Sequence, residues 1–263
     1  MIKALLDGLG DLIFPHNCIL CSQYVPNRSN PQLCSSCLAA IEFNEPPFCL
    51  RCSRHLKIYT AEGLCPACIK YPIQFDHAWG AVTYSDDVQR LLHLFKYHQR
   101  TSVRKIFRHF MGEFSGRYRM PLDMFDYGLP IPLHPVRLRE RGFNQSQLIA
   151  QILNEDHGLP IIENTLSRIR PTHPQSFLGQ KERWTNMEGA FKIKNHFSVN
   201  NSSILLIDDL LTTGATASAA AQTLKEAGAK HVGLFVVALT PSPTGGKEDI
   251  LNIPARSNYA NPS

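Results

Sequence analysis

The sequence predicts an α/β fold built on a parallel sheet with flanking helices, preceded by a small cysteine-rich module. All eight cysteines lie between Cys18 and Cys68, and none follows. Two apolar runs, 204–207 and 231–239, flank a helical stretch at 215–227, which is the pattern of one β-α-β unit. The 263 residues are 43% hydrophobic and 19% charged, so a globular core is expected.

Charge and hydropathy narrow the class of protein. The formal net charge of +5 is compatible with an anionic ligand but is too small to establish a nucleic-acid partner. No apolar run approaches the roughly 18 residues of a membrane helix. Asp7 and Asp11 interrupt the apolar N-terminal segment 1–14, which favours a short amphipathic helix over a signal peptide. We therefore expect a cytoplasmic protein without membrane insertion.

The cysteines form four Cys-x-x-Cys pairs, arranged as two copies of C-x2-C-x12-C-x2-C. Each such turn aims two sulfurs at one point, and two turns complete a tetrahedral shell around a metal that prefers sulfur. The segment is rich in polar and turn residues, so metal binding would supply much of its folding free energy. The expected ligands are Cys18, Cys21, Cys34, Cys37, and then Cys49, Cys52, Cys65, Cys68.

Other uses of the cysteines are weighed against this one. Disulfides belong to secreted modules, and no export signal is present. A thioredoxin-like role needs a single Cys-x-x-Cys in a βαβ context, whereas iron–sulfur ligation stays open. The repeat favours sites built from neighbouring pairs, although alternating pairs also fit the spacing. His16 and His55 lie nearby and are expected to be bystanders.

Two helices should follow a strand at 78–85. Ser85 can cap the first helix, and its apolar face is Val88, Leu91, Leu92 and Phe95. A second apolar stripe predicts another helix, whose aromatics are assigned to the core rather than to base stacking. That stripe consists of Val103, Ile106, Phe107, Phe110, Met111 and Phe114.

A basic segment separates a short strand near 128–133 from a helix that begins near Asn144 or Gln145. We expect a loop there, with Arg137, Arg139 and Arg141 at every second position. Guanidinium groups beside a helix N-terminus are suited to bind phosphate. A solvated loop that serves solubility is the alternative.

Residues 163–191 are polar and interrupted by proline, and they carry Arg168, Arg170, Lys181 and Arg183. A long segment of weak periodicity inside a compact domain favours a functional loop or lid. Residues 241–263 have the composition of a disordered tail. The expected domains are 1–72, 73–240 and this tail.

The strongest functional signal follows the buried strand 204–207. Asp208 and Asp209 come directly after it, then the turn TTGAT, then a helix that Gly228 should end. Ligands of such sheets bind beyond the carboxyl ends of the strands. No P-loop lysine is present, so an ATPase is not favoured. A phosphorylated sugar fits better, because the turn can wrap a phosphate and two carboxylates can accept hydrogen bonds from vicinal hydroxyls. Simple helix capping is the alternative.

The stretch LLIDDLLTTGAT resembles the phosphoribosyl-pyrophosphate signature of type I phosphoribosyltransferases. The match to the ComF family, which includes ComFC and GntX-like proteins, extends over nearly the whole chain. It rests on the cysteine pairs, LFKYHQR, PIPLHPVRLRERGFNQSQLIA, LSRIRPTHPQSFLGQKERWTNMEGAF and the Asp-Asp-Thr strand, in that order. The resemblance implies a phosphoribosyltransferase-like domain behind a double zinc ribbon with two structural zinc ions.

The resemblance also implies roles for particular residues. Asp208 and Asp209 would hold the ribose hydroxyls, and the segment of Arg137, Arg139 and Arg141 would be the pyrophosphate loop. Lys181 and Arg183 would make the closing catalytic contact, and Mg2+ would accompany the diphosphate. The 5-phosphate would bind Thr212, Thr213, Gly214, Ala215 and Thr216.

Three functions follow from these patterns. The first is an enzyme that transfers the phosphoribosyl group of phosphoribosyl pyrophosphate to an acceptor. The second is a DNA-uptake (competence) factor that binds single-stranded DNA or other uptake proteins and whose sugar site is regulatory or vestigial. The third treats the ribbons only as a folding element that docks on the α/β domain.

Overall fold

The structure is a computed structural model that describes residues 17–25, 32–57, 60–97, 101–171, 180–194 and 199–241. The expected N-terminal helix (1–14), His16 and residues 242–263 lie outside these ranges. Within the described ranges, none of the helices combines the length and apolarity needed to cross a membrane.

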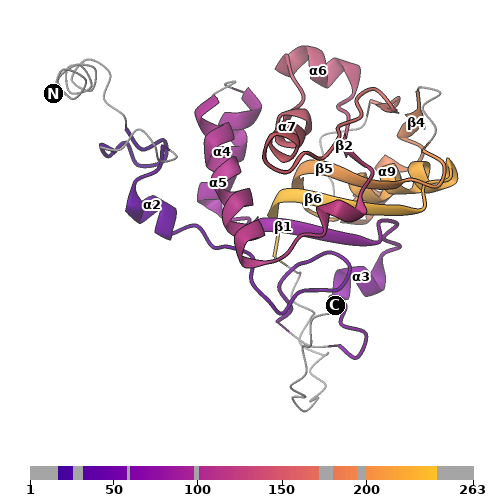
Figure 1. Cartoon of the computed structure of the whole chain (residues 1–263), viewed down its shortest axis with the longest axis horizontal. Coiled ribbons are helices and arrows are strands. Elements are labelled where there is room, and N and C mark those ends of the chain that lie inside the picture. The colour runs from indigo at the N-terminus through magenta and orange to yellow at the C-terminus, as the bar shows by residue number, and fades with distance from the viewer. Residues whose placement is uncertain are drawn as a thin grey trace.

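A four-stranded, fully parallel sheet forms the centre of the α/β domain (Figure 1). Its order is β1 (His77–Thr83), β6 (His231–Leu239), β5 (Ser203–Leu211) and β2 (Tyr127–Pro130). The central strands β5 and β6 are almost continuously apolar, as expected for strands covered on both faces. The predicted sheet is confirmed.

Helices cover both faces of the sheet. α4 (Asp86–Tyr97), α5 (Thr101–Arg117) and α7 (Gln145–His157) share one hydrophobic cluster with Leu205, Ile207 and Phe235. α9 (Ala215–Glu226) packs on the other side with Ile204, Leu206 and Leu234. Figure 1 shows α4, α5 and α7 grouped beside the sheet, away from α9.

Local sequence signals account for these helices. Ser85 Oγ accepts a hydrogen bond from Val88 N at 3.4 Å, as predicted for the start of α4. Asn144 caps α7 through Ser146 N at 3.2 Å, and Gly158 ends that helix with φ 71°. The aromatics of α5 are core residues, since Phe107, Phe110 and Phe114 are at most 1% exposed.

Three segments differ from expectation. The basic segment is not a loop but the helix α6 (Pro135–Arg141), because Pro135 stands at its first position and left-handed Gly142 ends it. β5 does not stop at 207 but continues through both aspartates, because β6 pairs with it as far as Leu211–Leu239. The described parts of the segment 163–191 contain regular elements, namely an antiparallel strand pair and a helix: β3 (Leu166–Arg168), β4 (Phe191–Ile193) and α8 (Gln180–Met187).

Two small ribbons precede the sheet. The first ribbon, residues 17–40, ends with α2 (Ser35–Ala39), and the second ribbon, residues 48–71, ends with α3 (Pro66–Lys70). Figure 1 shows α2 on the side of α4 and α5, and α3 beyond the β1 edge of the sheet. The linker between them runs antiparallel along β1 through the bridge between Phe43 and Val82.

A 3-10 turn, η1 (Leu122–Met124), precedes β2.

Candidate functional site

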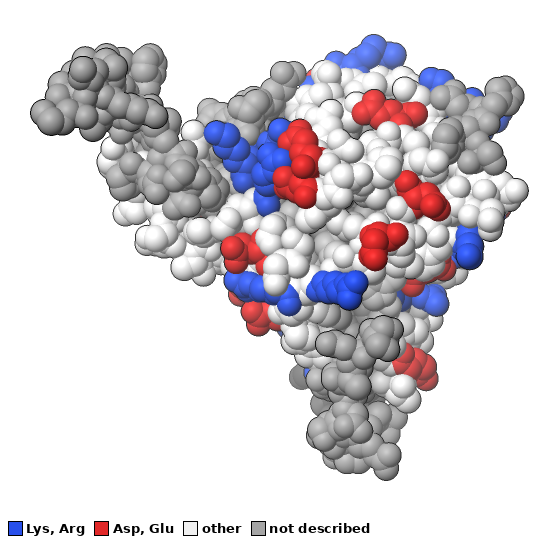
Figure 2. Space-filling view, viewed as in Figure 1, with Lys and Arg blue, Asp and Glu red and all other residues white. Residues whose placement is uncertain are grey.

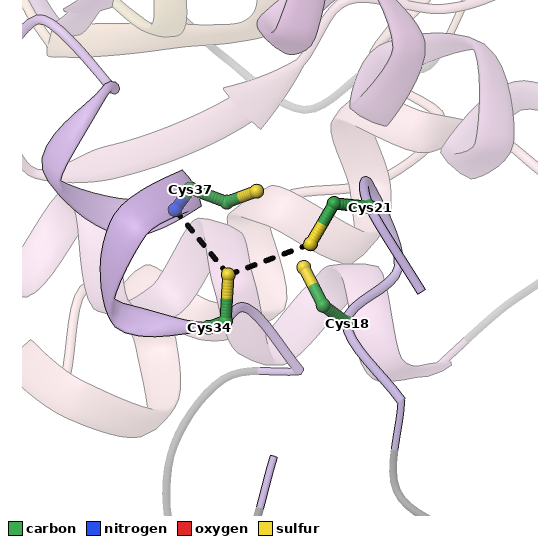
Figure 3. Close-up of side chains that lie close together, drawn as sticks. All are labelled: Cys18, Cys21, Cys34 and Cys37. Atoms are coloured by element: carbon green, nitrogen blue, oxygen red, sulfur yellow. Dashed lines mark hydrogen bonds between the residues drawn. The ribbon is translucent and has the colours of Figure 1, made fainter. Parts of the chain in front are cut away.

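The first ribbon brings four sulfurs together at the start of α2 (Figure 3). The ligand atoms of Cys18, Cys21, Cys34 and Cys37 all lie within 4.8 Å of one another. Cys21 Sγ and Cys34 Sγ are 3.5 Å apart, and Cys37 N donates to Cys34 Sγ at 3.4 Å. Cys21 is exposed, so this cluster lies close to solvent.

The second ribbon has the same arrangement in a buried setting. Cys49, Cys52, Cys65 and Cys68 meet the same 4.8 Å criterion, and all four are buried. Cys52 Sγ and Cys65 Sγ are 3.5 Å apart, and Cys65 N donates to Cys49 Sγ at 3.2 Å. Amide-to-sulfur hydrogen bonds of this kind stabilise thiolates that bind a metal.

The chemistry of both clusters fits tetrahedral zinc. All eight cysteines are free thiols, and each cluster consists of neighbouring pairs, the arrangement that the repeat favoured. Four thiolates complete a structural zinc shell without a further ligand. His55 is no member of either cluster: it is exposed, and its Nδ1 lies 2.9 Å from Glu45 O.

Asp208 lies where the carboxyl ends of β5 and β2 meet the start of α7. Its Oδ1 accepts hydrogen bonds from Ser146 Oγ at 2.9 Å and from Asp209 N at 2.9 Å. Burial, together with the neighbouring charge of Asp209, raises the pKa of Asp208 to about 7. The carboxyl therefore changes its protonation state near neutral pH.

Asp209 has different neighbours, because successive side chains of a strand point to opposite faces. Its Oδ2 forms a salt bridge of 2.8 Å with Lys96 Nζ, and both side chains are largely buried. Burial opposes the charge of Lys96, but the Asp209 carboxylate outweighs it and raises the pKa of Lys96. The two acids are thus adjacent near the end of β5, and each is held by a different partner.

The TTGAT turn forms a hollow beside Asp208. Gly214 adopts φ 85° before α9, a conformation that other residues rarely adopt, and no side chain caps that helix. Thr213 is buried, and its Oγ1 accepts a bond from Ala215 N at 3.4 Å, so its hydroxyl points back into the turn. The predicted residues that line the hollow are Asp208, Thr212, Gly214, Ala215 and Thr216.

The predicted arginines divide between two sides of α6. Arg137 and Arg141 are four residues apart and therefore lie on one face of the helix. Arg139, two residues from each, lies on the other side and is exposed. Arg168 of β3 is close enough for its pKa to respond to Asp208, Arg137 and Arg141, although burial is the main cause of its lowered pKa. The side chains of Lys181 and Arg183 lie outside the described residues; their backbone belongs to α8.

Two domain families match this chain, and several known proteins resemble it over most of its length. Residues 9–69 match the double zinc ribbon domain, and residues 144–256 match the phosphoribosyl transferase domain. Competence protein ComFC of Bacillus subtilis is 30% identical over 228 residues, which cover 80% of this chain and 89% of that protein. The chain belongs to the ComF family.

Two further relatives of this ComF chain are similar over most of their length. Competence protein F of Haemophilus influenzae is 27% identical over 233 residues, 86% of this chain and 97% of that protein. DNA utilization protein YhgH of Escherichia coli K12 is 26% identical over 226 residues, 80% and 98% respectively. The phosphoribosyl transferase match begins at the cap of α7, so β1, α4 and α6 lie outside it.

Sequence reasoning missed two residues that shape the site of this ComF chain. Lys96 continues the series Val88 and Leu92 at intervals of four, so it stands on the buried stripe of α4. A charged residue on an apolar stripe is a signal for a buried partner, here Asp209. Ser146 follows the cap of α7 and carried no comparable signal.

Proposed function

We propose that the protein binds magnesium phosphoribosyl pyrophosphate at the carboxyl edge of its sheet and transfers the phosphoribosyl group to an acceptor. The observation that carries the proposal is that Asp208 lines the TTGAT hollow and also lies near enough to Arg168 of β3 to affect its pKa, as do Arg137 and Arg141 of α6. A phosphorylated pentose suits these groups chemically, because its phosphate is anionic and its vicinal hydroxyls donate hydrogen bonds.

Each part of the ligand has its own protein group in this proposal. The 5-phosphate binds the TTGAT turn, where backbone N–H groups at the start of α9 favour an anion. The ribose hydroxyls donate to Asp208 and Asp209. Ser146 and Lys96 position those two carboxylates from α7 and α4.

The diphosphate lies toward α6 and β3. The acceptor attacks C1 of the ribose, the bond between C1 and the diphosphate oxygen breaks, and the diphosphate leaves with the electron pair. Arg137, Arg141 and Arg168 stabilise the charge that develops on it, and Lys181 and Arg183 of α8 would close over it. Arg139, on the opposite side of α6, has no part in this arrangement.

The oxygen-rich acid pair on β5 fits a hard divalent cation. Asp208 and Asp209 would contact Mg2+ together with the substrate oxygens, and the cation would supply charge neutralisation of the diphosphate. The protein's own part is to orient the sugar and to hold the leaving group.

A second candidate is a DNA-uptake factor that binds single-stranded DNA without turnover. The printed names of the relatives, competence protein and DNA utilization protein, favour it. On the face that Figure 2 shows, basic and acidic side chains are interspersed. Binding of single-stranded DNA would depend on contacts with its phosphates and would weaken as the salt concentration rises.

The two candidates are separated by incubating the protein with Mg2+ and phosphoribosyl pyrophosphate, with and without a set of bases and single-stranded DNA. Pyrophosphate release that depends on a base and is lost in Asp208→Asn and Asp209→Asn supports transfer. Arg139→Met is the matched control on α6 and should keep the release, whereas Arg141→Met should lose it. Salt-sensitive retention of DNA without release would instead support the second candidate.

The raised pKa of Asp208 predicts that the variant Asp208→Asn has opposite effects on protein stability and on ligand binding at pH 8. The unfolded carboxyl has a pKa of about 3.9, so ionising the folded carboxyl, with its pKa of about 7, costs stability as the pH rises between these values. Asp208→Asn should therefore stabilise the ligand-free protein at pH 8 by about 1–3 kcal/mol and change little at pH 4.

The same variant should bind phosphoribosyl pyrophosphate at least about tenfold more weakly at pH 8. Denaturant unfolding at both pH values and calorimetric titration measure the two effects. If Asp208→Asn instead lowers the free energy of unfolding at pH 8, the ionised Asp208 carboxylate does not destabilise the ligand-free protein.

A further inference from the structure

The side chain of Arg54, in the second ribbon, contacts the start of the TTGAT turn. It follows the metal ligand Cys52 by two residues and is only 3% exposed. Its Nε donates to Thr240 O at 2.8 Å, and its Nη2 donates to the carbonyls of Leu211 and Thr212. One guanidinium therefore joins the ends of β6 and β5 at the residue where the TTGAT turn begins.

The chain that leaves the ribbon supports the other end of the same turn. A Cβ at Gly214 would lie 3.1 Å from Ile73 Cδ1, so Ile73 packs directly against the turn. Ser218 Oγ, in the first turns of α9, accepts a bond from Gln74 N at 2.7 Å and donates to Pro72 O at 3.3 Å. The turn is thus held from behind at its beginning and at the helix that follows it.

We propose that the second ribbon is a positioning element of the sugar-phosphate site, and that Arg54 is the residue through which it acts. This inference rests on the proposed function for its ligand, but its structural part, restraint of the turn, does not. Binding a phosphate requires the turn's N–H groups to converge on one point. Fixing the carbonyls at the start of the turn lowers the conformational entropy that ligand binding must otherwise remove.

Arginine is suited to this role for a physical reason. Its planar fork can donate to several carbonyls in fixed directions, and it stays charged when buried. The guanidinium in turn depends on the ribbon, because Arg54 O accepts from Cys49 N at 2.8 Å within the cysteine cluster. A ribbon that loses its fold would release Arg54 and with it the turn.

The first ribbon contains a matched contact that reaches no ligand group. Arg90 Nη2 of α4 donates to Leu20 O at 2.8 Å, but the Arg90 side chain is 58% exposed and forms its ion pair with Asp87 of the same helix. Arg90→Met is therefore the control for Arg54→Met, since each variant removes an arginine that links a ribbon to the α/β domain by hydrogen bonding to backbone carbonyl oxygen.

The test uses the full zinc-loaded protein and compares wild type, Arg54→Lys, Arg54→Met and Arg90→Met. Amide hydrogen exchange is followed without ligand, and the Kd for magnesium phosphoribosyl pyrophosphate is measured by calorimetry. We expect faster exchange confined to residues 211–217 in Arg54→Met and a Kd raised about tenfold or more. Arg54→Lys should recover part of the loss, and Arg90→Met should match wild type in both measurements.

The inference is overturned if Arg54→Met keeps both its amide exchange rates at residues 211–217 and its Kd within about twofold of wild type. If wild type itself does not bind the ligand, the proposed function fails, and unchanged exchange in Arg54→Met still overturns restraint of the turn. If Arg54→Met does not fold, Arg54→Lys and Ser218→Ala, which removes only the α9 contact, are judged by the same two criteria.

Discussion

The two ribbons share one cysteine pattern but occupy different places in the molecule. Cys18 and Cys34 of the first join the hydrophobic cluster of α4, α5 and α7, and Cys21 remains exposed. All four cysteines of the second are buried in the cluster that contains α9 and the central strands. The second ribbon also stacks Tyr71 on Trp184 of α8, with ring centroids 5.4 Å apart.

This difference indicates that two metal sites with the same cysteine spacing can contribute differently to the stability of the α/β domain. The sequence repeat treats the two sites alike, because it records only the spacing of ligands. What separates them is the surface on which each ribbon packs: helices α4 and α5 for the first, and the sheet with its ligand turn for the second. Loss of each site should therefore have different consequences.

The largest effect is expected from zinc loss at the second ribbon. Structural zinc contributes on the order of 10 kcal/mol to the folding of its own module. Cys68→Ser should also cost the α/β domain about 3 kcal/mol, which lowers its Tm by roughly 6–12 °C. Cys37→Ser, the matched change in the first ribbon, should lose one zinc per chain and leave the main transition within about 3 °C.

Calorimetric unfolding together with a zinc assay checks this pair of variants. Equal losses of Tm in Cys68→Ser and Cys37→Ser would break the comparison, since they would show that burial of the second cluster adds nothing to the domain.

A smaller effect is expected at the linker that ties the second ribbon to β1. Asn44 is 2% exposed, and its Nδ2 donates to Ser53 O at 2.7 Å and to Gly80 O at 3.2 Å. Asn44→Ala should cost about 2 kcal/mol, because two buried carbonyls lose a donor. Urea unfolding measures this cost, and Asn44→Asp should not restore it because a carboxylate cannot donate to carbonyls.

The smallest effect is expected at the first ribbon. Arg90→Met removes the bond to Leu20 O and an exposed ion pair of 3.5 Å with Asp87. Such exposed contacts contribute about 0.5 kcal/mol or less. A cost of 2 kcal/mol or more in urea unfolding, comparable to that of Asn44→Ala, would mean that the first ribbon is held as firmly as the second.

Much of the fold could be predicted from local patterns. The cysteine spacing, the apolar strands on both sides of α9 and the cap at Asn144 each depend on neighbours in the chain. The helical state of α6 was missed because alternating arginines masked the signals of Pro135 and Gly142. This error also concealed that Arg139 lies apart from Arg137 and Arg141.

The candidate site was predictable only in part, because its remaining contacts join distant segments. Lys96 meets Asp209 across 113 positions of the chain, and Arg54 meets Thr212 across 158. No spacing rule links such residues, since only the packing of α4 and the second ribbon on the sheet brings them together. The expected domain boundaries at 72 and 240 remain predictions.

The central claim is that the acids of β5 and the turn after them bind a phosphorylated pentose. An NMR titration with ribose 5-phosphate tests it most directly, because this ligand lacks the diphosphate and needs no acceptor. The account predicts saturable shifts at the amides of residues 212–217 and their loss in Asp208→Asn. Saturation at other amides alone, or no shifts at all, would contradict it.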